Sequence, residues 1–84
     1  MIKTSVRKRR TSMERIYRLR LENMRKLIAA MDGNKARMAR ALGVDPSFVT
    51  HIAGDHPIRT IGEKLARDIE VKLGLMSSWL DQIH

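Results

Sequence analysis

A chain of 84 residues, of which 43% are hydrophobic and which carries a formal net charge of +8, is expected to form one small folded domain. Its length excludes a deep active site together with a second module, and the absence of cysteine excludes disulfides and cysteine-ligated zinc fingers. No apolar run approaches the roughly 20 residues of a membrane span, and the basic start lacks the apolar region of a secretory signal. A cytoplasmic location is therefore predicted.

Most of the positive charge lies at the start of the chain. Nearly all of the net charge of +8 is found in residues 1–20, where Glu14 is the one acidic side chain. Such a patch is typical of proteins that bind nucleic acid, because neutralised phosphates release condensed counterions. Residues 1–10 have no helical period and are predicted to form a flexible basic arm, with a solvated tail as the alternative and too few apolar groups for membrane insertion. The arm residues predicted to contact a nucleic-acid backbone are Arg7, Lys8, Arg9 and Arg10.

A long amphipathic helix is predicted from Thr11 to Met31. Thr11 and Glu14 fit a capping box, in which the two side chains bond free backbone N–H groups of the first turn. Apolar residues then recur at helical intervals, while charged residues occupy much of the opposite side. Asp32 and Gly33 are predicted to end the helix. The expected inward-facing residues are Met13, Ile16, Tyr17, Leu21, Met24, Leu27, Ile28 and Met31.

The next segment carries start and stop signals for two short helices joined by a tight turn. Asn34 can cap a helix over residues 35–42, and Gly43 supplies the left-handed residue that ends it. The chain restarts at Asp45, a capping carboxylate followed by a proline whose fixed φ suits the first helical position, and Gly54 is predicted to stop the second helix. The residues expected to pack inside are Met38, Ala39, Leu42, Val44, Val49 and Ile52.

A further helix is predicted beyond a turn at residues 55–57. Ile58 is expected to pack inward, and Thr60 with Glu63 fits a second capping box. One apolar stripe follows, the charges beside it are typical of a solvated face, and Gly74 is predicted to end the helix. The stripe consists of Ile61, Leu65, Ala66, Ile69 and Leu73, and the charged face of Lys64, Arg67, Asp68, Glu70 and Lys72.

A helix-turn-helix is predicted over residues 35–54. Its pattern consists of small, turn-forming and branched apolar residues at Ala39, Gly43, Val44, Val49, Ile52 and Gly54. In residue type and spacing it resembles the XRE-type DNA-binding unit of the lambdoid phage repressor and Cro family, and the resemblance continues to residues 77–81. It implies an all-α, compact five-helix domain over residues 11–84. It also implies a sequence-specific regulator of transcription, a phage-type or bacterial repressor that binds a double-stranded DNA operator.

By this resemblance, the helix that starts at Pro46 enters the major groove while the preceding helix crosses above the phosphates. Residues 45–54 contain no Arg, Lys, Asn or Gln, which usually make the bidentate base contacts, so shorter side chains are expected to read the bases. Two alternatives stay open: Phe48 packs under the fourth helix, and Thr50 bonds a phosphate. The predicted base-reading residues are Ser47, His51, Thr50, Phe48, Pro46 and Lys35. Outside the arm, the predicted backbone-contacting residues are Arg37, Arg40, Arg59 and Thr60.

Residues 75–83 can form a short fifth helix with Ser77 or Ser78 as its cap. One recognition helix reads few base pairs, so a symmetric homodimer on paired half-sites is expected. The predicted dimer contacts, as in related phage repressors that pair through their fifth helices, are Trp79, Leu80 and Ile83. The alternative is that Trp79 covers the domain's own core.

The sequence gives little support to catalysis. The histidines at positions 51, 56 and 84 are the strong general-base candidates, and none has nucleophile or metal-ligand spacing, so no catalytic residue, metal, cofactor or small-molecule ligand is expected. The alternative function is an antitoxin or protein-interaction module, whereas scattered aromatic residues disfavour RNA binding. Related repressors often continue into a self-cleaving serine-lysine domain, whose motifs are absent here, so the chain is expected to be either complete or an amino-terminal piece.

Overall fold

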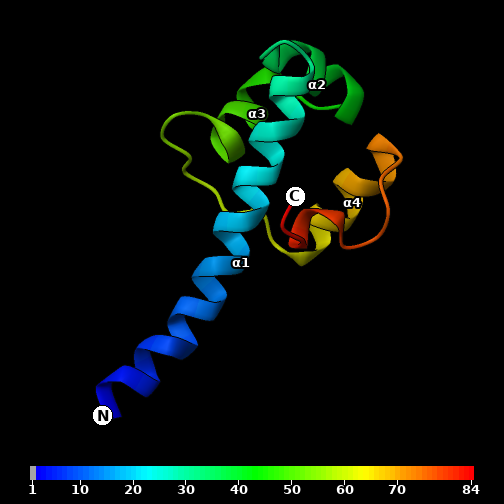
Figure 1. The fold of residues 1–84 in the computed structure, drawn as a ribbon. Helices are drawn as coiled ribbons and strands as arrows, with labels where there is room; N and C mark the ends of the chain where they lie inside the picture. Colours follow the sequence, from blue (N-terminus) through cyan, green and yellow to red (C-terminus); the bar gives the residue numbers. More distant parts are fainter. Residues whose placement is uncertain (1) are drawn as a thin grey trace.

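The computed structural model describes the backbone of residues 2–84 and the side chains of residues 14–84. Its elements, in chain order, are α1 (Ile2–Ala30), α2 (Lys35–Leu42), α3 (Pro46–Ala53), α4 (Glu63–Leu73) and the 3-10 helix η1 (Trp79–Asp81). α2 and α3 pack on each other near the C-terminal end of α1, α4 packs on α2, and η1 packs on both α1 and α4 (Figure 1). Residues 2–84 form no strand, so the predicted all-α class is confirmed. The predicted count of five helices is not, because the last one is a single 3-10 turn.

α1 begins earlier than predicted. Its bounds start at Ile2, so Thr11 lies inside the helix and not at its cap. Arginine, lysine, methionine and glutamate lie on either side of this threonine. All four have good helix propensity, so no local signal interrupts the helix near Thr11. The side chains of residues 1–13 lie outside the described part of the chain. The contacts of the basic arm predicted over residues 1–10 therefore stay a prediction.

The second half of α1 supplies one wall of the core. Met24 and Ile28 are buried, as their spacing predicted, and Leu21 and Leu27 pack against the same cluster. Ile16 was predicted on this face but is 41% exposed. Ile16 lies near the N-terminal limit of the part of α1 that packs on the core, and it lines a surface groove.

α2 has the bounds that its flanking residues predicted. Asp32 and Gly33 both have positive φ, 60° and 72°, and end α1 in a tight turn. Asn34 Oδ1 then accepts a hydrogen bond from the backbone N–H of Arg37 at 3.0 Å, which satisfies one free donor of the first turn. Gly43 ends α2 in the left-handed region with φ of 71°, where glycine carries no steric penalty.

α3 also has the predicted bounds, but its ends are built differently. Asp45 occupies the N-cap position without a side-chain capping bond, and its backbone carbonyl accepts from Phe48 N at 3.0 Å. Gly54 ends the helix with an extended backbone and donates its N–H to the carbonyl oxygen of Thr50 at 2.9 Å. A Cβ at Gly54 would lie 2.5 Å from that oxygen, so this close approach requires glycine.

The start of α4 contradicts the second predicted capping box. The helix begins at Glu63 with Gly62 as its N-cap, so Thr60 caps nothing. Ile61 enters the core from the extended segment just before the helix and is 1% exposed. Ile58, predicted to pack inward, is 75% exposed instead, because Ile61 fills the core position that this connection supplies.

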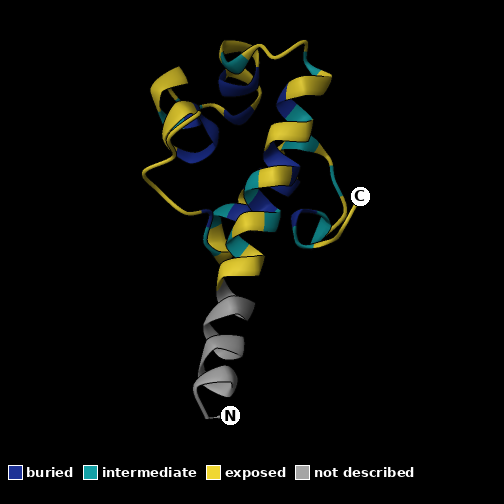
Figure 2. Ribbon diagram, turned by 60° about the vertical axis from the view of Figure 1, so that its left-hand side comes forward, coloured by how far each residue is buried: buried dark blue, intermediate teal, exposed yellow. Residues whose placement is uncertain are grey.

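The core lies between all four α-helices and η1. Buried segments of each element face one another, while the outer surfaces are exposed (Figure 2). The exposed outer side of α4 and its buried stripe follow the predicted helical period, with Leu65 and Leu73 at the edges. The buried apolar residues are Met24, Ile28, Met38, Ala39, Leu42, Val49, Ile52, Ala53, Ile61, Ala66, Ile69 and Leu80.

A buried polar network joins α1 to the later half of the chain. Arg20, only 4% exposed, donates to both Asp81 oxygens, with its Nε 2.6 Å from Oδ1. Its Nη1 donates to the carbonyl oxygen of Ile61 at 2.9 Å, and its Nη2 to Glu63 Oε1 at 3.0 Å. The hydrogen bond from Arg20 holds the pKa of Asp81 below its usual value. Arg20 contributes to the positive charge of residues 1–20, but it is buried and paired and so is not available to a phosphate.

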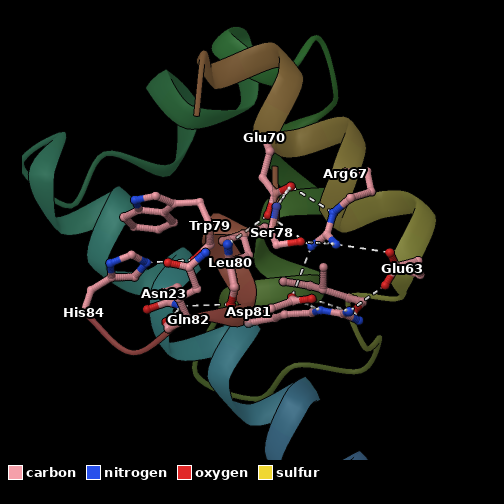
Figure 3. Close-up of polar contacts among 12 residues, drawn as sticks. Asn23, Glu63, Arg67, Glu70, Ser78, Trp79, Leu80, Asp81, Gln82 and His84 are labelled. Carbon is pink, nitrogen blue, oxygen red and sulfur yellow. Dashed lines mark hydrogen bonds and ion pairs between the residues drawn. The ribbon is translucent and has the colours of Figure 1, made fainter. Parts of the chain in front are cut away.

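Two further buried side chains anchor the C-terminal segment (Figure 3). Glu70 was predicted on a solvated face, yet it is 1% exposed, and its two carboxylate oxygens accept from the backbone N–H groups of Ser78 and Leu80, each at 2.9 Å. Asn23, fully buried, donates to the carbonyl oxygens of Leu80 at 2.8 Å and Gln82 at 2.7 Å. Few backbone N–H and C=O groups of this segment are paired within a helix. Side chains from α1 and α4 therefore provide hydrogen-bond partners for them.

Candidate nucleic-acid interface

One face of α3 carries exposed polar side chains. Ser47, Thr50 and His51 are spaced three and four residues apart, so they share this face, and all three are exposed. Val49 and Ile52 lie on the opposite face and are buried in the core. α3 itself contains no acidic residue that would repel phosphates. The face can therefore present two hydroxyls and an imidazole to a polar surface such as the edges of base pairs.

The hydroxyl of Thr50 is partly committed inside the helix. Thr50 Oγ1 donates to the carbonyl oxygen of Pro46 at 3.3 Å, a common bond for threonine within a helix. Its oxygen can still accept a hydrogen bond from outside. Pro46, also predicted to read bases, is exposed at the first position of α3.

Phe48 is half-buried at the edge of the same face. Its ring packs against the hydrophobic core, and it also lines a shallow depression with Ser47, His51 and the turn residues 43–45. The guanidinium of Arg59 lies over the ring, with Cζ 5.2 Å from the ring centroid. The ring is thus in contact with both the core and Arg59, which leaves a limited surface to offer to DNA.

α2 brings basic side chains to the flank of α3, against which it packs. Arg37 and Arg40 are exposed and three residues apart, so they lie on the same side of the helix. Lys35, predicted to reach the edge of the groove, is half-buried at the first position of α2. These cations can contact a phosphate backbone that runs beside α3.

The connection from α3 to α4 folds back against the end of α3. The backbone N–H groups of Ile58 and Arg59 both donate to the carbonyl oxygen of His51, at 3.0 and 3.1 Å. Arg59 and Thr60, the two predicted backbone contacts in this connection, are exposed. The loop therefore places a second set of polar groups beside α3, in addition to those that α2 supplies.

Arg25 of α1 supports the end of α3, which the sequence analysis did not predict. Its Nη2 donates to the carbonyl oxygen of Gly54 at 2.6 Å. This oxygen follows the last turn of α3, where carbonyl groups lack partners within the helix. The contact joins residues 29 positions apart in the sequence, so no local pattern could have shown it.

The three predicted dimer contacts have different environments. Leu80 is fully buried in the core of its own chain and cannot face a second copy in this conformation. Trp79 is half-buried against the same core, and its ring stacks on the imidazole of His84 with the centroids 3.8 Å apart. Ile83 is 84% exposed. Of the three predicted contacts, Ile83 and the open part of Trp79 are therefore the ones that can face a partner.

Two observations concern metal sites and membrane spans in the part of the chain that the structure describes. No group of three or more His, Cys, Asp or Glu side chains there is placed to hold a metal ion. None of the helices there has the length and apolar character needed to cross a membrane. The predicted arm contacts Arg7, Lys8, Arg9 and Arg10 lie outside the described side chains.

Comparison with known proteins gives one similarity. Over 72 residues the chain is 35% identical to the prophage repressor CohE of Escherichia coli (strain K12), a match that covers 86% of this chain and 32% of that protein. The chain thus spans about a third of the length of the curated relative that it matches. No family model matches the chain, and no solved structure matches it. The similarity confirms the resemblance to phage repressors that the helix-turn-helix pattern predicted.

Proposed function

We propose that this chain is the DNA-binding unit of a repressor that recognises a specific double-stranded operator. The observation that carries the proposal is the exposed polar face of α3, made by the uncharged or basic side chains of Ser47, Thr50 and His51. The similarity to a prophage repressor supports a regulatory role for a domain with such a face.

The dimensions of α3 suit the major groove. An α-helix with its side chains is roughly 10–12 Å across, which fits the roughly 12 Å width of the major groove in B-DNA. Packing of α2 across the inner face of α3 leaves the outer face free to enter. In this arrangement Ser47 and His51 read bases by single hydrogen bonds, with Thr50 as an acceptor.

The flanking residues would then hold the duplex. Arg37 and Arg40 belong to α2, Thr60 belongs to the loop that follows α3, and the basic arm adds charge. Contacts of this kind fix the register of the protein on DNA and supply salt-dependent affinity without sequence information.

Selection from a pool of random-sequence duplexes, at one stated salt concentration, tests the proposal. We expect one sequence pattern to be enriched. We expect a protein with Ser47→Ala and His51→Ala together to lose the preference at the base pairs that these two residues read, while it retains salt-dependent binding to bulk DNA. A wild-type protein that enriches no sequence would refute the proposal. Copurification with a protein partner in that case would favour the antitoxin alternative.

We also propose that two copies bind paired half-sites. Ile83 is the most exposed of the predicted contacts, so Ile83→Ala is expected to weaken pairing on a two-half-site duplex without lowering the melting temperature. Trp79→Ala serves as the comparison, because it should also cost stability through the removal of core packing. Equilibrium sedimentation with and without DNA gives the mass. A wild type that stays monomeric on its enriched duplex would exclude the dimer.

A further inference from the structure

The recognition helix lacks the side chains that specify bases most strongly. Residues 46–54 contain no arginine, lysine, asparagine or glutamine. Serine, threonine and histidine can each make single hydrogen bonds, but a bidentate arginine contact to guanine is the commonest specific contact in the major groove. A long planar donor must therefore come from outside α3 if the protein makes such a contact.

Arg59 lies against α3 in a position to supply it. Its Cζ is 5.2 Å from the centroid of the Phe48 ring, within the range of a cation–π interaction. Phe48 belongs to the first turn of α3, and the N-terminal residues of a recognition helix are those that meet base edges. The stack thus brings a guanidinium from the loop to the end of α3 that reads DNA.

The loop that carries Arg59 is fixed to α3 by its backbone. The carbonyl oxygen of His51 accepts from both Ile58 N at 3.0 Å and Arg59 N at 3.1 Å. With the main chain held at one end and the guanidinium held on the ring at the other, Arg59 loses less side-chain entropy on binding than a free surface arginine would.

The N–H groups of the Arg59 guanidinium remain free for a ligand. Arg59 is exposed, and no carboxylate or carbonyl group among the described residues accepts a hydrogen bond from its side chain. Three other arginines are already paired: Arg20 with Asp81, Arg67 with Glu70, and Arg25 with a backbone carbonyl. A cation–π contact uses no hydrogen-bond acceptor, so the contact to Phe48 leaves the N–H donors of the guanidinium available.

We propose that Arg59 reads a guanine in the operator, donating two hydrogen bonds to O6 and N7, and that Phe48 is the residue that positions it. This proposal rests on the proposed function. It reassigns Arg59 from the phosphate contact predicted by sequence to direct base recognition, and it gives the Phe48 ring the role of a platform in place of the predicted base contact.

The test compares Arg59→Lys with Arg37→Lys, a matched change at an exposed arginine proposed to contact a phosphate. The probes are the duplex most enriched by the wild-type protein and each single-base-pair variant of it, with Kd measured at one salt concentration. We expect Arg59→Lys to reduce discrimination at one G·C pair about tenfold or more, because lysine keeps the charge but lacks the planar pair of donors. Arg37→Lys is expected to leave the whole preference profile unchanged.

Phe48→Leu separates positioning from direct reading. It is expected to reduce discrimination at the same G·C pair while Arg59 keeps its charge, and thermal unfolding reports whether this variant is folded. An unchanged profile in Arg59→Lys would overturn the proposal, as would a folded Phe48→Leu that changes preference only at a different pair. Both results differ from a failure of the proposed function, in which the wild type enriches no duplex at all.

Discussion

Glu70→Gln tests whether a buried carboxylate holds the C-terminal segment in place. The two oxygens of Glu70 accept from the N–H groups of Ser78 and Leu80, each at 2.9 Å, and Arg67 Nε lies 2.8 Å from Oε1. Glutamine keeps the shape but replaces one acceptor with an NH₂ donor. One buried N–H group then loses its partner, and Arg67 loses its nearest carboxylate.

The magnitude follows from these contacts. A hydrogen bond to a charged group contributes about 1.5–3 kcal/mol, and a buried donor left unpaired costs a similar amount. Arg67 is 26% exposed and keeps Glu63 at 3.1 Å and Asp81 at 3.2 Å, so the loss on its side is partly offset. We expect Glu70→Gln to lower the free energy of unfolding by about 2–3 kcal/mol, which for a domain of this size lowers the melting temperature by roughly 10–20 °C.

Asp68→Asn on the same helix is the matched control. Asp68 and Lys72 form an exposed ion pair at 3.1 Å, with side chains that are 52% and 44% exposed. Such a pair contributes less than about 0.5 kcal/mol. Urea and thermal unfolding, followed by circular dichroism, measure both variants. Equal stability of Glu70→Gln and Asp68→Asn would refute the assignment of Glu70 as an anchor.

Three other predictions concern acid stability, base reading and the arm. The hydrogen bond from Arg20 lowers the pKa of Asp81 in the folded state. The ionised Asp81 therefore stabilises the fold above the ordinary aspartate pKa of 3.8, and this stabilisation is lost as the pH falls below that value. Asp81→Asn should therefore be less stable than wild type at neutral pH and converge with it in acid unfolding curves; a constant gap down to the lowest pH would contradict this. Ser47→Ala and His51→Ala should each lose about 1–3 kcal/mol of binding at one base-pair position, and uniform weakening across all operator variants would show that they only position the protein. Deleting residues 1–10 should flatten the slope of log K against log salt by about 0.9 for each phosphate that the arm neutralises while the preferred sequence is kept, and an unchanged slope would identify the arm as a solvated tail.

The bounds of α2 and α3 could be predicted because their signals are local. Asn34, Gly43 and Gly54 act through the backbone conformation of their own turns, so residue type and spacing are enough. The start of α4 was predicted wrongly at Thr60 because a capping box is also local in sequence, whereas the course of this connection is decided by Ile61 entering the core.

The polar core could not be predicted by the same reasoning. Arg20 and Asp81 are 61 positions apart, and Glu70 bonds backbone groups beyond the end of its own helix. A charged residue within an apolar stripe, such as Arg20 between Tyr17 and Met24, is the one sequence signal of burial. It indicates that a partner exists but not which residue provides it.

The candidate interface also combines features that local sequence predicts with features that it does not predict. The exposure of Ser47 and His51 follows from the helical period of α3, so sequence alone placed them on the outer face. The stack of Arg59 on Phe48 depends on a loop that bonds back to His51, a route that no pattern of residue types specifies. Sequence thus predicted that this face of α3 is exposed, but not what surrounds it.

The way in which the C-terminal segment is held sets the smallest unit of this chain that can fold autonomously. A fragment ending at Gly74 would keep α1, α2, α3 and α4, so by secondary structure alone it would be taken for the whole domain. It would also remove the backbone partners of Glu70 and Asn23, and it would remove Leu80 from the core and leave apolar side chains exposed there. Residues 75–82 are therefore part of the cooperative folding unit and not a tether. A mapping experiment that trims from this end is expected to abolish folding before it removes any residue of the candidate interface.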